Sequence, residues 1–229
     1  MGNGVRSGTG TADDPFVISG WDIDARTADG ISLSNLRSHV VVRGNAIHDG
    51  LSSSGRYVYS GIVVQDCGNV TSEGNELFQN YDGIFLRERA TALVRENRID
   101  DARNSAIESY DSDGPILANE INRAGGAAIA WSAPAVSDRS ASIRGNSVDG
   151  AQVGIHVRGG RDHVVVGNEV ARATAQGIFL EATQGTSAIR DSLVERSGTG
   201  VEVAGAPSSV STLTATRNKV GFAVDDSAR

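Results

Sequence analysis

Gly83-Ile84-Phe85-Leu86 is one copy of a short motif that recurs along the whole chain: a glycine or alanine followed by three residues suited to a β-strand. The first residues of the nine copies are Gly30, Gly61, Gly83, Ala106, Ala128, Gly154, Gly177, Gly200 and Gly221. Successive copies begin 21 to 31 residues apart, and six of the eight steps are 21 to 23 residues. A repeat of this length indicates a solenoid, in which each unit buries its apolar face against its neighbours.

A column of asparagines supports the same repeat. One asparagine precedes the strand motif in six of the units, at Asn45, Asn75, Asn97, Asn119, Asn146 and Asn168. The spacing predicts Asp191 and Thr212 at this position in the eighth and ninth units. Amides stacked in register can hydrogen-bond to the copies above and below, so we interpret the asparagines as structural.

The length and composition of each unit limit its structure. Apolar triplets such as Val40–Val42 and Val164–Val166, broken by Gly, Asn and Asp, are typical of short strands joined by turns. No stretch has the apolar periodicity of a helix, and the signatures of leucine-rich and calcium-binding nonapeptide repeats are absent. The sequence therefore predicts an all-β fold: a single-stranded, right-handed parallel β-helix solenoid of about nine coils over residues 15–229, after a flexible lead-in over residues 1–14.

Composition excludes several classes of function. A net charge of −7 argues against binding to the phosphate backbone of a nucleic acid. The single cysteine, Cys67, rules out an intrachain disulfide. No apolar run approaches the length of a membrane span, so no membrane insertion is expected, and the first residues lack the apolar segment of a signal peptide.

Two insertions, Leu51–Tyr59 and Ser132–Asp138, are expected to form loops. Loops in solenoids often lie on the binding face but are also simply tolerated.

Candidate functional residues follow from the alternation of side chains along the repeated strand. If the residues one and three after the Gly or Ala face the core, those two and four after it face outward. The first outward column is then Ser32, Val63, Phe85, Glu108, Ala130, His156, Phe179, Glu202 and Ala223. The second is Ser34, Gln65, Arg87, Tyr110, Ser132, Arg158, Glu181, Ala204 and Asp225.

These columns place charged and aromatic side chains around a shallow gap at the small residues Ala130 and Ser132. Aromatic rings can stack on sugar faces, and arginines bind carboxylates through paired hydrogen bonds. Contacts with a substrate are therefore predicted for Phe85, Arg87, Tyr110, Ser132, Phe179 and Glu181. The candidate catalytic residues are Glu108 and His156, which can transfer protons, and Arg158. The alternative is a solvated face on which Arg158 and Glu181 form only a cross-strand ion pair.

No metal site is predicted. His39 and His163 occupy equivalent turns five units apart, about 24 Å, so they cannot share a metal ion. Asp111-Ser112-Asp113-Gly114 is similar to the start of a calcium-binding loop and leaves calcium as an open alternative, although Asp-Gly turns are common for backbone reasons alone. No other cofactor is expected.

The strand column, the asparagine column and the opening segment Pro15–Ile23 resemble the right-handed β-helix repeats of the pectate-lyase-like superfamily, and most of all its NosD-type and carbohydrate-binding (CASH) repeats. The resemblance implies the fold, which polysaccharide lyases, glycoside hydrolases, uronate epimerases, surface adhesins and viral tail spikes share. The catalytic motifs differ. Ile84-Phe85-Leu86 follows Tyr81-Asp82-Gly83 where mannuronan epimerases have Asp-Pro-His, and the aspartate pair and Gly-His-Gly of polygalacturonases are missing.

Two classes of function remain. The first is an extracellular or cell-surface module that binds an acidic polysaccharide along the strand face, with processing by a lyase, hydrolase or epimerase reaction left open. The second is a structural or adhesive component of a cell surface or a virion, without catalysis. In both, we expect a homo-oligomer or a contact with another domain through the last coil, since the chain shows no cap for its strand edge.

Overall fold

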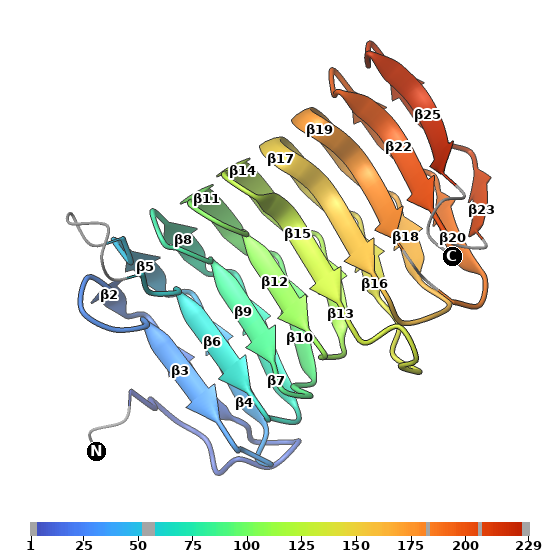
Figure 1. Cartoon of the computed structure of the whole chain (residues 1–229). Helices are drawn as coiled ribbons and strands as arrows, with labels where there is room; N and C mark the ends of the chain where they lie inside the picture. Colours follow the sequence, from blue (N-terminus) through green and yellow to red (C-terminus); the bar gives the residue numbers. More distant parts are fainter. Residues whose placement is uncertain (1–3, 52–57, 182–183, 206–207, 226–229) are drawn as a thin grey trace.

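The computed structural model describes residues 4–51, 58–181, 184–205 and 208–225 of the chain, and the central part of the first insertion, Ser52–Tyr57, lies outside these residues. Within them the protein is a parallel β-solenoid of about nine turns without a helix (Figure 1). The predicted right-handed β-helix fold is confirmed. No helix of the described segments is long and apolar enough to cross a membrane.

Each turn contributes strands to three faces. The first face is a nine-stranded sheet of β1 (Phe16–Ser19), β4 (Val40–Arg43), β7 (Val70–Glu73), β10 (Ala92–Arg95), β13 (Pro115–Leu117), β16 (Ser142–Arg144), β18 (Val164–Val166), β20 (Ser187–Arg190) and β23 (Ser208–Ser211). The second face consists of β2 (Asp22–Asp24), β5 (Ala46–His48), β8 (Glu76–Phe78), β11 (Arg98–Ala102), β14 (Glu120–Ala124), the first halves of β17 (Ser147–Arg158) and β19 (Glu169–Glu181), β21 (Leu193–Glu195) and β24 (Thr214–Thr216).

The third face, which we call the strand face, carries the recurring motif. It consists of β3 (Ile31–Ser34), β6 (Ile62–Gln65), β9 (Ile84–Arg87), β12 (Ile107–Tyr110), β15 (Ala127–Ser132), the second halves of β17 and β19, β22 (Thr199–Ala204) and β25 (Val220–Asp225). Figure 1 shows these strands side by side along the axis, with β17 and β19 continuing from one face to the next.

The predicted alternation of side chains on the strand face is confirmed, except that Val63 and Ala204 of the outward columns are buried. Ile84 is paired with Ile62 on one side and with Ile107 on the other, and the same register continues along the solenoid. In β9, Ile84 and Leu86 are buried, whereas Phe85 and Arg87 are partly exposed. Apolar residues of the inward columns thus form one continuous core along the axis.

The glycines that open the strands are required by a close approach between turns. A Cβ atom on Gly83 would lie 2.5 Å from the carbonyl oxygen of Ala106 and 2.7 Å from the side chain of Ile99. On Gly154 it would lie 2.4 Å from the carbonyl oxygen of Gly177. Gly221 has nothing within 4 Å, because β25 has no strand of the described chain on its far side.

The asparagine column forms a buried ladder. Each Nδ2 donates to the Oδ1 of the next asparagine at 2.9 to 3.0 Å, from Asn45 as far as Asn168. The prediction of Asp191 at the next position was wrong: the backbone N–H of Asn168 donates to Ser192 Oγ at 3.2 Å, and the strand register places Leu193 opposite Glu169. Asp191 instead has a left-handed backbone, with φ of 54°. By the same register Leu213, not Thr212, holds the position in the last turn.

The two ends of the solenoid differ. Residues 4–14 bond to the first turn, where Ser7 bridges Val17 and Trp21 Nε1 donates to the Gly4 carbonyl oxygen at 2.9 Å. At the other end β25 pairs only with β22 among the described strands. The side chains of Phe222 and Val224 there are 46% and 71% exposed.

Candidate functional site

All the predicted site residues lie on the strand face, on five neighbouring strands. The first column aligns Phe85, Glu108, Ala130, His156 and Phe179, and the second aligns Arg87, Tyr110, Ser132, Arg158 and Glu181. The strand β15, with only Ala130 and Ser132 facing outward, is flanked by β12 and β17 with larger side chains. The backbones of β12 and β17 are about 10 Å apart.

Glu108 belongs to a carboxylate cluster at the entry of the strand face. Asn104 Nδ2 donates to Glu108 Oε2 at 3.1 Å and to Asp82 Oδ1 at 2.8 Å. Because one nitrogen bonds both oxygens, these oxygens lie no more than about 6 Å apart. Asp82 is only 4% exposed, and its Oδ1 also accepts the backbone N–H of Ser105 at 3.1 Å. The structure therefore joins two carboxylates through one amide.

The surroundings of the two carboxylates raise both pKa values. Burial is the main reason that the pKa of Asp82 lies above its ordinary value, against the hydrogen bonds from Asn104, Ser105 and Ser60. Burial also raises the pKa of Glu108, and the negative charge of Asp82 adds to this. Glu108 consequently keeps its proton to a higher pH than a solvated glutamate.

Sequence reasoning missed Asp82 and Asn104. Asp82 was considered only as part of Tyr81-Asp82-Gly83, and a further signal was its place directly before Gly83, where other turns have Asp29, Ser60 and Ser105. Such residues can cap backbone N–H groups, as Asp29 Oδ1 does for Ser60 N at 2.9 Å. The proximity of Asp82 to Glu108 arises from stacking, since Asp82 is one turn below.

His156 lies in a second cluster beyond β15. Its Nε2 is 3.0 Å from Glu181 Oε2, and its ring stacks on Phe179 with centroids 4.9 Å apart and an interplanar angle of 8°. Arg158 Nε is 3.7 Å from the same Glu181 oxygen. Glu108 and His156 therefore stand on opposite sides of β15, and each has a different carboxylate partner.

Arg87 and Tyr110, two of the predicted binding residues, differ in how accessible their side chains are to a ligand. Arg87 Nη2 donates to Gln65 Oε1 at 2.8 Å, and its guanidinium lies 5.5 Å from the Phe85 ring centre. Its Nε is buried without a hydrogen-bond partner among the described residues. Tyr110, by contrast, is 53% exposed beside β15. Tyr110 is thus the aromatic side chain of this face that is most open to a ligand.

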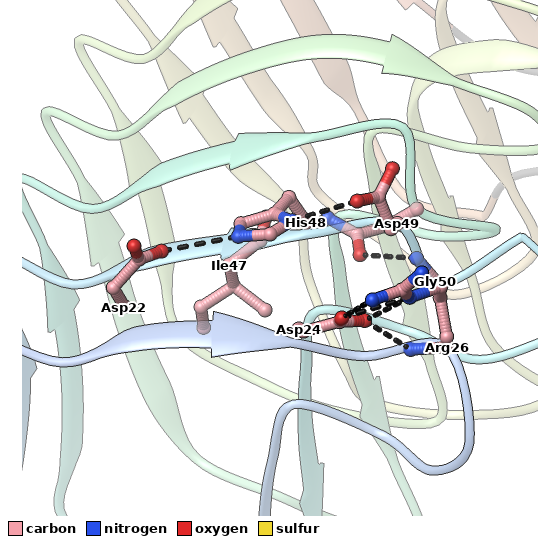
Figure 2. Close-up of polar contacts among 8 residues, drawn as sticks. Asp22, Asp24, Arg26, Ile47, His48, Asp49 and Gly50 are labelled. Carbon is pink, nitrogen blue, oxygen red and sulfur yellow. Dashed lines mark hydrogen bonds and ion pairs between the residues drawn. The ribbon is translucent and has the colours of Figure 1, made fainter.

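A similar histidine lies on the second face, and the sequence analysis did not single it out. Figure 2 shows His48 between two carboxylates, with Nδ1 2.9 Å from Asp49 Oδ2 and Nε2 3.0 Å from Asp22 Oδ1. The His48 ring stacks on Phe78 at 5.0 Å, as His156 does on Phe179. The hydrogen bond with Asp49 is the largest cause of a raised pKa at His48. A stacked His and Phe beside a carboxylate is thus a recurrent arrangement of neighbouring strands, whereas the Asp82–Asn104–Glu108 bridge distinguishes the strand face.

The comparisons with known proteins agree with this architecture. The profile of the family described as "Right handed beta helix region" matches residues 82–229. The chain belongs to this β-helix family. The profile of NosD, described as "Periplasmic copper-binding protein", matches residues 3–137 of the β-helix protein. The resemblance to pectate-lyase-like β-helix repeats is therefore confirmed. No curated protein matches the sequence.

Two solved structures of a GH136 lacto-N-biosidase from Eubacterium ramulus are similar to the β-helix protein. The selenomethionine derivative is 8% identical with a TM-score of 0.40, and the native protein is 9% identical with a TM-score of 0.35. Both matches cover 87% of this chain and 60% of the solved chain. The chain thus spans less than two thirds of the length of these structures.

The described part of the β-helix protein holds no group of three or more His, Cys, Asp or Glu side chains that could bind a metal ion. His163 is buried: its Nδ1 accepts the N–H of Ala141 at 2.9 Å and its Nε2 donates to the Gly159 carbonyl oxygen at 2.8 Å, while burial lowers its pKa. Both carboxylates of the calcium-like segment, Asp111 and Asp113, pair with Arg139.

Proposed function

We propose that this β-helix protein binds an acidic polysaccharide on its strand face. The observation that carries the proposal is the arrangement around β15: a strand with small outward side chains lies between Tyr110 and the carboxylate cluster on one side and the His156–Phe179 stack on the other. Ring faces and hydrogen-bonding groups at this spacing suit a polyhydroxylated chain. Arg158, with a side chain that is 64% exposed, supplies a guanidinium for a sugar carboxylate.

We propose further that Glu108 transfers a proton during processing of the bound glycan. A general acid works best when its pKa lies near the working pH, and burial together with Asp82 moves the pKa of Glu108 in that direction. Asn104 positions the Glu108 carboxyl group through its hydrogen bond, and the negative charge of Asp82 raises the pKa of Glu108. His156 and Arg158 face the same strand from the other side.

The periplasmic location in the description of the NosD family supports a site of action outside the cytoplasm, and we propose an extracellular or cell-surface setting. The competing proposal is a structural or adhesive module of a cell surface or virion. It differs in requiring no retention of a glycan on the strand face, so one experiment separates the two.

The test replaces three residues of the strand face together: Glu108→Gln, Tyr110→Ala and His156→Gln. Each protein is mixed with acidic and neutral polysaccharides, then run on size-exclusion chromatography with light scattering. We expect the wild type to elute with an acidic glycan and the triple variant to lose at least about tenfold in affinity, because an exposed aromatic side chain and two hydrogen-bonding groups are removed from the binding face.

The second face offers a matched control in Glu120→Gln, Phe78→Ala and His48→Gln, which removes the same kinds of side chain. We expect this variant to retain the glycan, provided that its thermal melt shows a folded protein. If no glycan elutes with the wild type and it forms a discrete oligomer, glycan binding is excluded and the structural module takes its place.

Processing is tested separately with Glu108→Gln and Asp82→Asn. Shortening of the glycan, or a change in its uronate composition by NMR, should be lost in Glu108→Gln while retention persists. Asp82→Asn should shift the pH optimum toward lower pH, because removal of the Asp82 charge takes away one cause of the raised pKa of Glu108. A wild type that binds but leaves the glycan unchanged would contradict this part of the proposal.

A further inference from the structure

A shallow groove of about 710 Å³ lies at the turns that lead from the second face to the strand face. Its wall includes the side chains of Arg103, Arg123 and Arg172, with Asp101 as the acidic residue. Arg123 and Arg172 pair with Asp101 and Asp149, and Arg103 makes no ion pair among the described residues, so the groove keeps a net positive charge on a chain with a net charge of −7. The groove therefore suits a negatively charged ligand.

The groove exists because a glycine interrupts a column of long side chains. The strand register places Asp101, Arg123, Gly150 and Arg172 at the same turn of four successive coils, all with a left-handed backbone. A Cβ atom on Gly150 would meet only Arg123, at 3.9 to 4.0 Å, so the space above this glycine is open. Arg123 and Arg172 stand on either side, about 10 Å apart along the axis.

The three arginines that line the groove retain N–H groups without a hydrogen-bond partner among the described residues. Arg123 uses Nε and Nη2 on Asp101, at 2.5 and 2.7 Å, which leaves Nη1. Arg172 uses Nη2 on Asp149, which leaves Nε and Nη1. Arg103 is exposed, and within the described residues its side chain makes no hydrogen bond or ion pair. A guanidinium group with free N–H donors binds an oxyanion such as carboxylate or sulfate.

The groove leads directly onto the strand face. Gly125 lines it and is followed by Gly126 and by β15, the strand with small outward side chains. On the neighbouring turn, Arg103 is followed by Asn104, which holds Glu108. A chain bound over β15 would therefore continue into the groove along the strand direction, over a path of about 23 Å from Gly125 to Ser132.

We infer that the groove is a subsite for a carboxylate or sulfate substituent of the glycan, and that the glycan crosses the solenoid along β15 instead of following its axis. This inference rests on the proposed function for the identity of the ligand. The anion site itself is independent of it, since its residues lie outside the strand face.

The test compares Arg103→Gln/Arg172→Gln with Arg144→Gln/Arg190→Gln, which removes two exposed arginines from the first face. Binding is measured by calorimetry with polygalacturonate oligosaccharides, with chondroitin sulfate oligosaccharides, and with the carboxyl-reduced form of the former. We expect the groove variant to lose about tenfold in affinity for the charged ligands, to keep its affinity for the reduced one, and to approach the wild type at high salt. The first-face variant should match the wild type throughout.

A second measurement separates failure of the subsite from failure of glycan binding. Inorganic sulfate is titrated into the protein while the arginine Nε–H resonances are followed by NMR. Saturable shifts at Arg103 and Arg172 support the anion site even if the wild type binds none of the oligosaccharides. Absence of these shifts, or equal losses by the groove variant for charged and reduced ligands, overturns the inference.

Discussion

His48 on the second face and Glu108 on the strand face show that the two faces affect the charged form of a side chain in opposite ways. His48 stands between Asp22 and Asp49, and these carboxylates stabilise its protonated form. Glu108 is half-buried beside Asp82, so its ionised form is disfavoured. One environment is a surface ion pair and the other is a paired-carboxylate site.

We predict that His48 stabilises the folded protein by an amount that depends on pH. The folded-state pKa of His48 is raised above its ordinary value of 6.5. Its contribution is therefore fully present below about pH 6.5 and is lost as the pH rises through the higher folded value. His48→Gln should lower the free energy of unfolding by about 0.5 kcal/mol at pH 5.5 and by less at pH 8.5.

Urea unfolding at both pH values measures this difference. His39→Gln is the control, because no carboxylate partner of His39 occurs in the described part of the chain. If His48→Gln lowered the free energy of unfolding equally at both pH values, stacking on Phe78, and not the charge of His48, would be the source of the stabilisation.

At the scale of the secondary-structure elements, the strand motif combines a missing side chain with an apolar alternation. The glycine allows the start of one strand to approach the carbonyl oxygen of the next turn, and the alternation buries the first and third residues after it. The asparagine ladder satisfies the backbone and amide groups at the turn before the second face. Each turn is thus stabilised mainly by its neighbours.

The glycine column yields a prediction with a control in the same column. Gly154→Ala places a Cβ atom 2.3 Å from Val170 Cγ1 and 2.4 Å from the Gly177 carbonyl oxygen. We expect a loss of about 1–3 kcal/mol in the free energy of unfolding, because the two turns must separate. Gly221→Ala occupies open space and should stay within about 0.5 kcal/mol of the wild type.

Thermal and urea melts of the two variants provide the measurement. Equal melting temperatures would mean that the glycines are not needed for close stacking.

At the scale of the whole molecule, the solenoid presents two unlike ends. The first turn is covered by residues 4–14, with Arg6 packed over the ring of Trp21 at 3.7 Å. The last described turn exposes Val220, Phe222 and Val224. A strand edge with exposed apolar residues is a surface on which another strand can pair.

We predict that this end mediates association with another chain. Phe222→Asp with Val224→Asp should shift the protein toward the monomer in sedimentation velocity, since two charges would be buried at the contact. Val136→Asp is the control, because Val136 is 86% exposed but lies in the second insertion. A wild type that is monomeric at every concentration tested would contradict the prediction.

The sequence by itself determined the solenoid and the two outward columns. Strand side chains alternate with a period of two and the turns stack in register, so the neighbours of Glu108 within its column follow from adding one repeat length: Phe85 on one side and Ala130 on the other. Only the tertiary structure decided which polar groups meet at the turns. Many turn residues, among them Asp101, Arg123 and Asp191, have left-handed backbones that break the alternation, so their side-chain directions cannot be counted from the strand. Three features arise at these turns, where the path of the backbone and not the period of the strand sets the contacts. They are the Asp82–Asn104–Glu108 bridge, the groove above Gly150, and the position of Ser192, instead of Asp191, after Asn168 in the ladder.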